Sequence, residues 1–458
     1  MTDPESHWPP PVYAQPSVVG PPAGTSAELP AELPVSPVAV VDTPPKRSKG
    51  KLIVGMVAAT ALLGAGVFAV ASLAGREGDG GAASPTEVGT KLTDALSNED
   101  ALGVIDLLLP GERETFRQPL IDVIDNLRRI EVLDAKASLN KVGGLDLEFT
   151  DVKVTPTPTN VDDITNIEIT GQGTASLDSK KVPIGSLLIE EAFDGKRPNL
   201  DRAKQTNDVD VKVTTVQRGG RWYLSAFYTA AERARGDRDI PTKGVAAAGA
   251  DSPEKAVEAM LAAISDQSLE TGIALLNPNE AEALQRYAPI FLTDSQQQID
   301  DAKLNWKISD TTFTTEGSGS RRSVAITGFH FTAKQNDGKV DVSLKDGCLV
   351  IVSGSSTNDS CKSGSSLDDV LAQSGLDQNE SLTKLIDSVK NAFSDFHAKG
   401  IAVNQVGGLW YVSPIGSLTD LLVSGLASLD KVEIKDIIKA TRDFSGSDGG
   451  LDLGGING

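Results

Sequence analysis

An internal duplication constrains the fold of this chain more than any other feature of its sequence. Ser84 recurs as Ser252, each followed by Pro and then by apolar residues with the i, i+4, i+7, i+8 spacing of one helical face. At the same spacing of 168 residues, the run LLLPGE matches LLNPNE. Closer to the C-terminus, GGRWYLS at 219–225 matches GGLWYVS at 407–413. The chain therefore contains one module used twice.

Each copy predicts three helical stretches followed by antiparallel strands. Ser84 and Ser252 are candidate N-caps, because each has Pro at the first helical position. The two glycines before each repeated tryptophan suit a tight hairpin turn between the last two strands. We predict an α+β fold in which helices pack on one face of a curved antiparallel sheet. The expected domains are 84–235 and 252–440, joined by a linker at 236–251.

The second copy is expected to carry an insertion and an extra helix. Its longer strand region holds both cysteines of the chain, Cys348 and Cys361. An even number of cysteines in an oxidising compartment favours a structural disulfide between them, with free thiols as the alternative. A helical pattern over 417–439 is expected to pack back on this second domain, and the Gly-rich end, 441–458, is predicted to be disordered.

The N-terminal region predicts a tail and a membrane span. Residues 1–51 contain 12 of the 24 prolines and should form a disordered cytoplasmic tail. Residues 52–74 carry no charge and could cross ~30 Å of hydrocarbon, whereas a cleaved signal peptide has a shorter apolar region of ~7–15 residues. The positive-inside rule then predicts a single-pass, signal-anchored protein of the cell membrane with an extracytoplasmic C-terminus. The basic residues that set this orientation are Lys46, Arg47, Lys49 and Lys51.

The composition limits the classes of partner. The chain has 43 basic and 63 acidic residues, a net charge of -20, which argues against nucleic acid as a partner. Two Cys and three His are too few for a structural zinc site of four Cys and leave little for a His-based one. The sequence also contains no phosphate-binding, dinucleotide-binding or hydrolase motif. We therefore expect no metal and no cofactor.

The order of elements resembles the cystatin-like, nuclear-transport-factor-two-like cone fold. The S-P start, the L-x-P-x-E corner and the final G-G-x-W-Y strand carry this resemblance over about three quarters of the chain. More narrowly, the sequence is similar to actinobacterial single-pass membrane proteins with duplicated exterior domains. The resemblance implies a cone-shaped fold in each copy and a place in the cell envelope, but no activity, because none of these motifs is catalytic.

Candidate site residues are few. Trp222 and Tyr223 match Trp410 and Tyr411, and one of each pair could form the floor of a ligand pocket. Neighbouring strand residues face opposite sides, so at most one of each pair should face the interior, where core packing is the competing role. His330 lies between two phenylalanines and could be a general base in such a pocket, or a sheet residue without a catalytic role.

These observations predict a non-enzymatic protein of the cell envelope. It would bind an envelope protein or a small ligand, or scaffold an envelope complex. One alternative is a carrier that holds a small apolar ligand in the cone cavities. A second alternative, from a different class, is an enzyme that uses an acid/base residue in a pocket.

Overall fold

A computed structural model provides the structure of this chain. All the described residues belong to one compact unit, Ser48–Gly458. The predicted tail, its basic residues Lys46, Arg47, Lys49 and Lys51, and Cys361 lie outside the described residues, and the predicted domain limits stay a prediction. The structure describes residues 80–139, 143–302, 305–335, 338–345, 347–353, 356–359 and 400–445.

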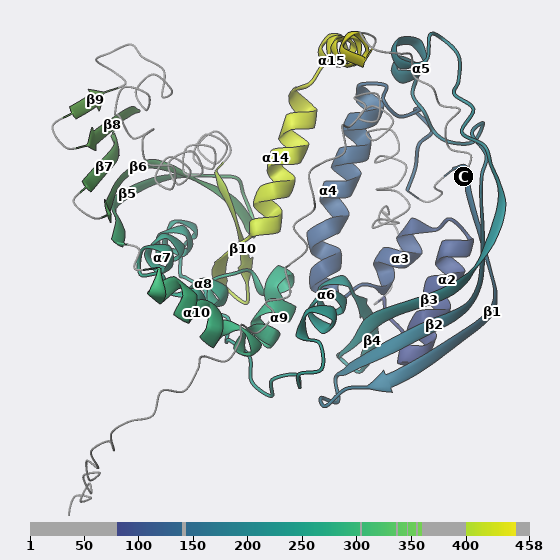
Figure 1. Cartoon of the computed structure of the whole chain (residues 1–458), viewed down its shortest axis with the longest axis horizontal. Coiled ribbons are helices and arrows are strands. Elements are labelled where there is room, and N and C mark those ends of the chain that lie inside the picture. The colour runs from purple at the N-terminus through teal and green to yellow at the C-terminus, as the bar shows by residue number, and fades with distance from the viewer. Residues whose placement is uncertain are drawn as a thin grey trace, which may run out of the picture. The chain divides into compact units, whose positions relative to one another are not determined.

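The first repeat consists of helices on the concave side of a four-stranded antiparallel sheet (Figure 1). The strands follow the order β1-β2-β3-β4, and α2 and α3 lie inside their curve. The elements are α2 (Pro85–Ser97), α3 (Ala101–Leu107), α4 (Pro110–Arg129), β1 (Leu145–Pro158), β2 (Ile164–Leu177), α5 (Ser186–Ala192), β3 (Arg202–Arg218), β4 (Arg221–Ser225) and α6 (Ala226–Arg235).

The second repeat has the same order of helices and then strands, with a larger sheet. Its strands follow the order β11-β10-β6-β7-β8-β9, and β5 pairs with β6 on a branch. The elements are α7 (Pro253–Ser265), α8 (Leu269–Ala274), α9 (Pro278–Tyr287), the 3-10 helix η1 (Ala288–Ile290), α10 (Leu292–Asp301), β5 (Asn305–Glu316), β6 (Arg321–Gln335), β7 (Gly338–Lys345), β8 (Cys348–Ser353), β9 (Ser356–Asp359), β10 (Ile401–Val406), β11 (Leu409–Val412), α14 (Pro414–Ser428) and α15 (Lys431–Ser445).

The duplicated motifs occupy equivalent positions in the two repeats. The Ser84 hydroxyl accepts a hydrogen bond from the Glu87 backbone N–H, and Ser252 caps α7 in the same way. In the first repeat, Ala82 and Leu108 form single β-bridges to the last strand. The second repeat repeats both bridges, at Ala250–Trp410 and Leu276–Val412. The predicted duplication is therefore present in the backbone pairing as well as in the sequence.

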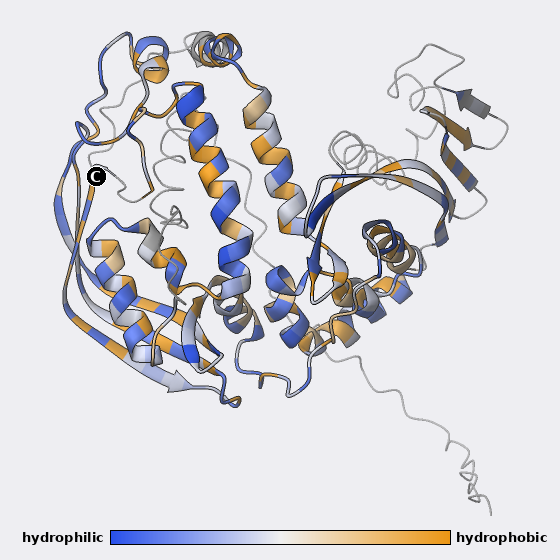
Figure 2. Cartoon of the chain, turned by 180° about the vertical axis from the view of Figure 1, so that it is seen from behind, coloured by the Kyte–Doolittle hydropathy of each residue, from blue (hydrophilic) through white to orange (hydrophobic). Residues whose placement is uncertain are grey.

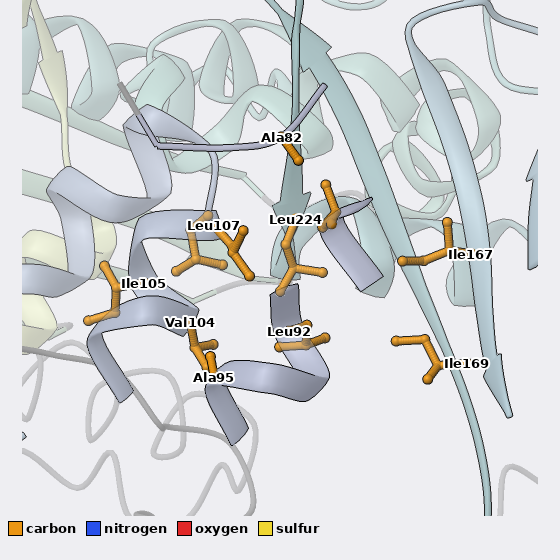
Figure 3. Packing of buried hydrophobic residues seen from close by; sticks show 11 residues of the cluster. Ala82, Leu92, Ala95, Val104, Ile105, Leu107, Ile167, Ile169 and Leu224 are labelled. Carbon is orange, nitrogen blue, oxygen red and sulfur yellow. The ribbon is translucent and has the colours of Figure 1, made fainter. Parts of the chain in front are cut away.

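Each repeat encloses its own apolar core. In the first repeat, Leu92 and Ala95 of α2 pack with Ile167 and Ile169 of β2, and Leu224 of β4 closes the cluster (Figure 3). These positions include the face predicted from helical spacing. In the second repeat, the corresponding cluster contains Ala256, Val257, Val324, Val403, Trp410 and Val412. Each repeat therefore combines helices with an antiparallel sheet, and the chain is a mixed α/β structure with two antiparallel sheets.

The C-terminal helices contact the first repeat, which differs from the sequence expectation. Helix α14 packs against α4, and α15 packs against α5. Ile438 of α15 is buried in a cluster with Val182, Ile184 and Leu188 of the first repeat. The Arg129 guanidinium also donates to the carbonyl oxygens that end α14, at distances from 2.8 Å. Periodicity identified the apolar face of these helices, but it carries no information on which surface covers that face.

The structure corrects the prediction of a membrane helix. Within the ranges that it describes, no helix is both long enough and apolar enough to cross a membrane. The longest of them, α4, has 20 residues but carries charges along its length, and the apolar α14 has only 15 residues. The predicted span itself, 52–74, lies outside those ranges.

The predicted disulfide is not described as a complete pair. Cys348 opens β8 and is disulfide-bonded, while Cys361 lies outside the described residues. Strands β7, β8 and β9 form the added antiparallel ribbon that enlarges the second sheet. The insertion therefore extends the sheet, and its pairing of cysteines stays a prediction.

Candidate functional site

The aromatic pairs predicted for a pocket floor are packed in cores instead. Trp222 lies against the apolar core of the first repeat, and Tyr223, on the opposite face of β4, is buried in a second cluster beneath α6. Trp410 and Tyr411 are also both buried. Trp222 and Tyr223 therefore lie in separate clusters, as expected for neighbouring residues that face opposite sides of a strand, and the outer face is covered as well.

A glycine that approaches closely explains why the tyrosine of each pair is buried. A Cβ atom on Gly81 would lie 2.6 Å from Tyr223 Cε1, and one on Gly249 would lie 2.7 Å from Tyr411 Cζ. Gly81 and Gly249 are themselves separated by the repeat spacing of 168 residues. The segment before each repeat's first helix therefore lies directly on the tyrosine of the last strand.

His330 lies far from these aromatic residues. Its Nδ1 is 3.7 Å from an Asp310 carboxylate oxygen, and its Nε2 is 3.4 Å from one of Asp341. Strand β6 reaches β10 only at Val324 and before, so ~20 Å of strand separates His330 from that end of the sheet. The ring is 38% exposed. The structure therefore places His330 on an open sheet surface and not in a pocket with the tryptophans.

A buried carboxyl joins two repeated motifs that the sequence treats as separate. Glu112, the third residue of α4, is only 2% exposed. Its carboxyl accepts hydrogen bonds from the Ser225 hydroxyl, from the Ala226 N–H at 2.8 Å and from the Phe227 N–H at 3.4 Å. Ser225 in turn caps α6. The L-x-P-x-E corner is thus bound to the serine that ends the G-G-x-W-Y strand.

The second repeat contains the same clasp. The Glu280 carboxyl accepts from the Ser413 hydroxyl, from the Ile415 N–H at 3.0 Å and from the Asn277 side-chain amide at 3.0 Å. Ser413 caps α14. We call the pairs Glu112–Ser225 and Glu280–Ser413 the two clasps. Sequence reasoning missed them, although glutamate and serine recur together in both copies.

Burial controls the ionisation of both clasp carboxyls. Desolvation raises the pKa of Glu112 to about 7, although its hydrogen bonds act in the opposite direction. Desolvation also raises the pKa of Glu280, against the hydrogen bond from Ser413. Each carboxyl therefore holds its proton to a higher pH than an exposed glutamate would.

A pocket of about 320 Å³ lies between α6 and α9, where the two repeats meet. Small side chains on the facing helices create the space, notably Ala230, Ala231 and Ala234 of α6 and Ala283 of α9. Glu280 of the second clasp also forms part of the wall. The remaining lining residues are Phe227, Arg235, Arg238, Leu284, Tyr287, Ile290 and Phe291.

The equivalent helix of the second repeat has larger residues at the same places. Counted from the capping serines Ser225 and Ser413, Ala230 corresponds to Leu418 and Ala234 corresponds to Leu422. The small residues at these two positions are therefore found in α6 of the first repeat and not in α14 of the second.

Polar contacts between the repeats hold the pocket walls in place. The Tyr287 hydroxyl of α9 donates to a Glu232 carboxylate oxygen of α6 at 2.5 Å. The same carboxylate accepts from the Arg235 guanidinium at 2.9 Å. Nearby, Arg218 of the first repeat pairs with Glu282 of the second at 2.5 Å. The pocket is thus bounded by elements that are bonded to each other across the junction.

A second hollow, of about 500 Å³, lies beside α2 and α3 and is lined by charged side chains. These side chains have structural partners. Asp100 caps α3, and Lys91 pairs with Glu87 at 2.9 Å. Across the described part of the chain, no group of three or more His, Cys, Asp or Glu residues could hold a metal ion.

Comparison with known proteins identifies no family. No family model matches the chain, and no curated protein matches it. A solved structure described as an Ntf2 like protein involved in plasmid conjugation is similar over 52% of this chain and 86% of its own length, with 11% identity and a TM-score of 0.12. So low a TM-score carries no argument about this chain, and the resemblance to actinobacterial membrane proteins stays a prediction.

Proposed function

We propose that this chain is a non-enzymatic binding protein whose ligand occupies the pocket between α6 and α9. The ligand would have an apolar body and an anionic end group. The observation that carries this proposal is an apolar pocket at the junction of the repeats with an arginine that has no carboxylate partner among the described residues, Arg238.

The lining supports an apolar ligand body. Alanine, leucine, isoleucine and aromatic side chains make up most of the wall. The volume of about 320 Å³ lies at the lower end of the range for small-molecule sites, roughly 300–1,000 Å³. By contrast, the cone interiors are filled by the two apolar cores. A carrier function therefore belongs at the junction and not inside the cones.

The charges around the pocket support an anionic end group. The Arg235 guanidinium is neutralised by the Glu232 carboxylate. The Arg238 guanidinium instead donates to carbonyl oxygens, to that of Arg235 at 2.9 Å and to those of Ile290 and Ala234 at longer distances. Its charge is therefore available to a carboxylate or phosphate at the edge of the pocket.

The polar groups in the wall favour binding over catalysis. The lining contains no serine, cysteine or histidine. Glu280 is the obvious candidate acid, but its two oxygens already accept hydrogen bonds from Ser413, Ile415 and Asn277. Its role in the clasp therefore competes with any role as a proton donor to a ligand.

Calorimetric titration of the full-length chain with octanoate and with octanol tests the proposal. We expect octanoate to bind more tightly, and Arg238→Gln to remove about tenfold of that preference, which is ~1.4 kcal/mol. The double change Ala230→Leu and Ala234→Leu should weaken both ligands at least tenfold. It installs residues that α14 already carries at the equivalent positions, so the helix should tolerate them.

The matched control is Ala262→Leu, at an exposed alanine of α7 outside the pocket. This variant should bind both ligands as the unmodified chain does. Equal affinities for the double variant and the control, or no measurable binding of octanoate by the unmodified chain, would overturn the proposal.

A further inference from the structure

We propose that the outward face of α14 is a contact surface for a second copy of this chain. This inference concerns a different surface from the ligand pocket and goes beyond the proposed function. The face consists of Leu418, Leu421, Leu422 and Gly425, which have the i, i+3, i+4, i+7 spacing of one helical stripe. We call these four residues the α14 stripe.

The stripe is apolar and exposed. Leu418 is 66% exposed, Leu422 is 54% exposed and Leu421 is 36% exposed. The other side of the helix is covered, because α14 packs against α4 and β10. Figure 2 shows α14 in orange and pale tones along its length, whereas α4 alternates orange with blue. Contiguous exposed apolar surface of this kind marks interaction sites in folded proteins.

The internal duplication explains why nothing in the described chain covers these leucines. The equivalent positions of α6, Ala230 and Ala234, line the same pocket as Ile290 and Phe291. These two residues lie where the chain turns through η1 after the short helix α9. Helix α4 occupies the position of α9 in the first repeat, but it continues as one helix for 20 residues. Within the described ranges, no turn comparable to η1 therefore closes over α14.

Gly425 indicates that the missing partner is a helix. A Cβ atom on Gly425 would have no neighbour within 4 Å, so the described fold does not require a glycine there. Glycine inside a helix is destabilising relative to alanine. A glycine in line with three exposed leucines forms a notch, and such a notch lets the ridge of a crossing helix approach closely.

The absence of free charge on α14 fits an uncharged partner surface, and the stripe of a second copy is one. Asp420 is the only charged residue of α14, and its carboxylate is paired with Arg321 at 2.6 Å. A basic or acidic partner helix would therefore find no charge to pair with on the stripe. Two copies, each carrying a net charge of -20, repel one another except where the facing surfaces are uncharged. The α14 stripe is such a surface.

The stripe is also complementary to itself. In an antiparallel crossing, Leu422 of each copy would lie over Gly425 of the other, and Leu418 would approach Leu429. This arrangement is the isologous contact of a twofold dimer. A helix of 15 residues is only ~22 Å long, so the buried area stays below the ~1,600 Å² of a standard interface. We therefore expect a weak dimer with a micromolar dissociation constant.

Sedimentation velocity of the full-length chain over a concentration series tests the proposal. The unmodified chain should show a concentration-dependent dimer. Leu422→Glu should weaken association at least tenfold, because it would bury an unpaired charge. Gly425→Leu should also weaken it, because the side chain fills the notch. In the monomer this side chain has open space, so the melting temperature should stay equal or rise.

Ile264→Glu is the control, since Ile264 of α7 is 46% exposed and lies outside the stripe. This variant should dimerise as the unmodified chain does. A chain that stays monomeric at every concentration would overturn the proposal. If Leu422→Glu lowered the melting temperature of such a monomer, another segment of the same chain would be the occupant. Loss of the dimer in the Ile264→Glu variant would likewise refute the assignment to α14.

Discussion

The Glu112 carboxyl should make the fold less stable at neutral and alkaline pH than at acidic pH. Burial raises its pKa from 4.5 to about 7, so the folded state keeps a proton that the unfolded state loses between these values. The stabilisation is fully present below about pH 4.5 and is lost as the pH rises through 7. A shift of this size corresponds to about 3 kcal/mol.

Glu112→Gln isolates this effect because glutamine is neutral at every pH. The amide can keep one oxygen acceptor for Ser225 and Phe227, but its NH₂ group would face the Ala226 N–H, which now binds the carboxyl at 2.8 Å. Leaving that buried donor unpaired costs roughly 1–3 kcal/mol. At pH 5 Glu112 has already lost about 1 kcal/mol of its stabilisation, so the variant should be less stable than the unmodified chain by up to about 2 kcal/mol.

At pH 8 the order should be reversed. The unmodified chain has then lost about 3 kcal/mol from Glu112, whereas the variant has lost nothing from this position, so the variant should be more stable by up to about 2 kcal/mol. The difference between the two free energies of unfolding should cross zero between about pH 5 and pH 7. The crossing depends only on the clasp, because every other titrating group is shared.

Urea unfolding at pH 5, 6, 7 and 8 measures this difference. Tryptophan fluorescence reports on Trp222 beside the core of the first repeat, and far-UV circular dichroism should give coincident transitions. Glu258→Gln, at an exposed position of α7, is the control and should follow the unmodified chain at every pH. A Glu112→Gln difference that stays constant from pH 5 to pH 8 would refute the reasoning.

Two further predictions concern packing and the junction. Gly249→Ala should lower the free energy of unfolding by ~1–3 kcal/mol in thermal melts, because the new Cβ would lie 2.6 Å from Leu409 Cβ. The control is Gly272→Ala on α8, where a Cβ would face open space, and it should be neutral or stabilising by up to about 1 kcal/mol. Tyr287→Phe should lower the free energy of unfolding by ~1–3 kcal/mol in urea titrations, since it removes a donor to the buried Glu232 carboxylate. Glu282→Gln should cost under ~1 kcal/mol, because both side chains of the Arg218–Glu282 pair are partly exposed. The opposite order of the two costs would contradict the assignment of the junction contacts.

Local features of the fold were predictable because they depend on neighbouring residues. Ser84 and Ser252 cap their helices as expected. The first repeat's glycine pair also forms the expected turn, with φ of +57° at Gly219 and +79° at Gly220. Both angles lie in the left-handed region, which glycine adopts without steric cost.

Long-range contacts were not predictable from the same patterns. Ile264 shares the apolar spacing of Ala256 and Ala263, yet it is 46% exposed, because helical spacing does not specify how much of a face other elements cover. The Glu112–Ser225 clasp joins residues 113 positions apart, and nothing in a helical period encodes that distance. The burial of Ile438 against the first repeat has the same origin.

The difference between α6 and α14 connects the two proposals. Both helices begin at a clasp serine and follow the same last strand, so the backbone supplies two equivalent surfaces. Alanine at 230 and 234 leaves a pocket in one of them, and leucine at 418 and 422 makes a protruding stripe of the other. Exchanging these residues between the two helices should therefore exchange their properties. Leucine at 230 and 234 should close the pocket of α6 without affecting dimerisation. Alanine at 418 and 422 should abolish the dimer and leave octanoate binding unchanged. If either exchange changed both properties, the two surfaces would not act independently.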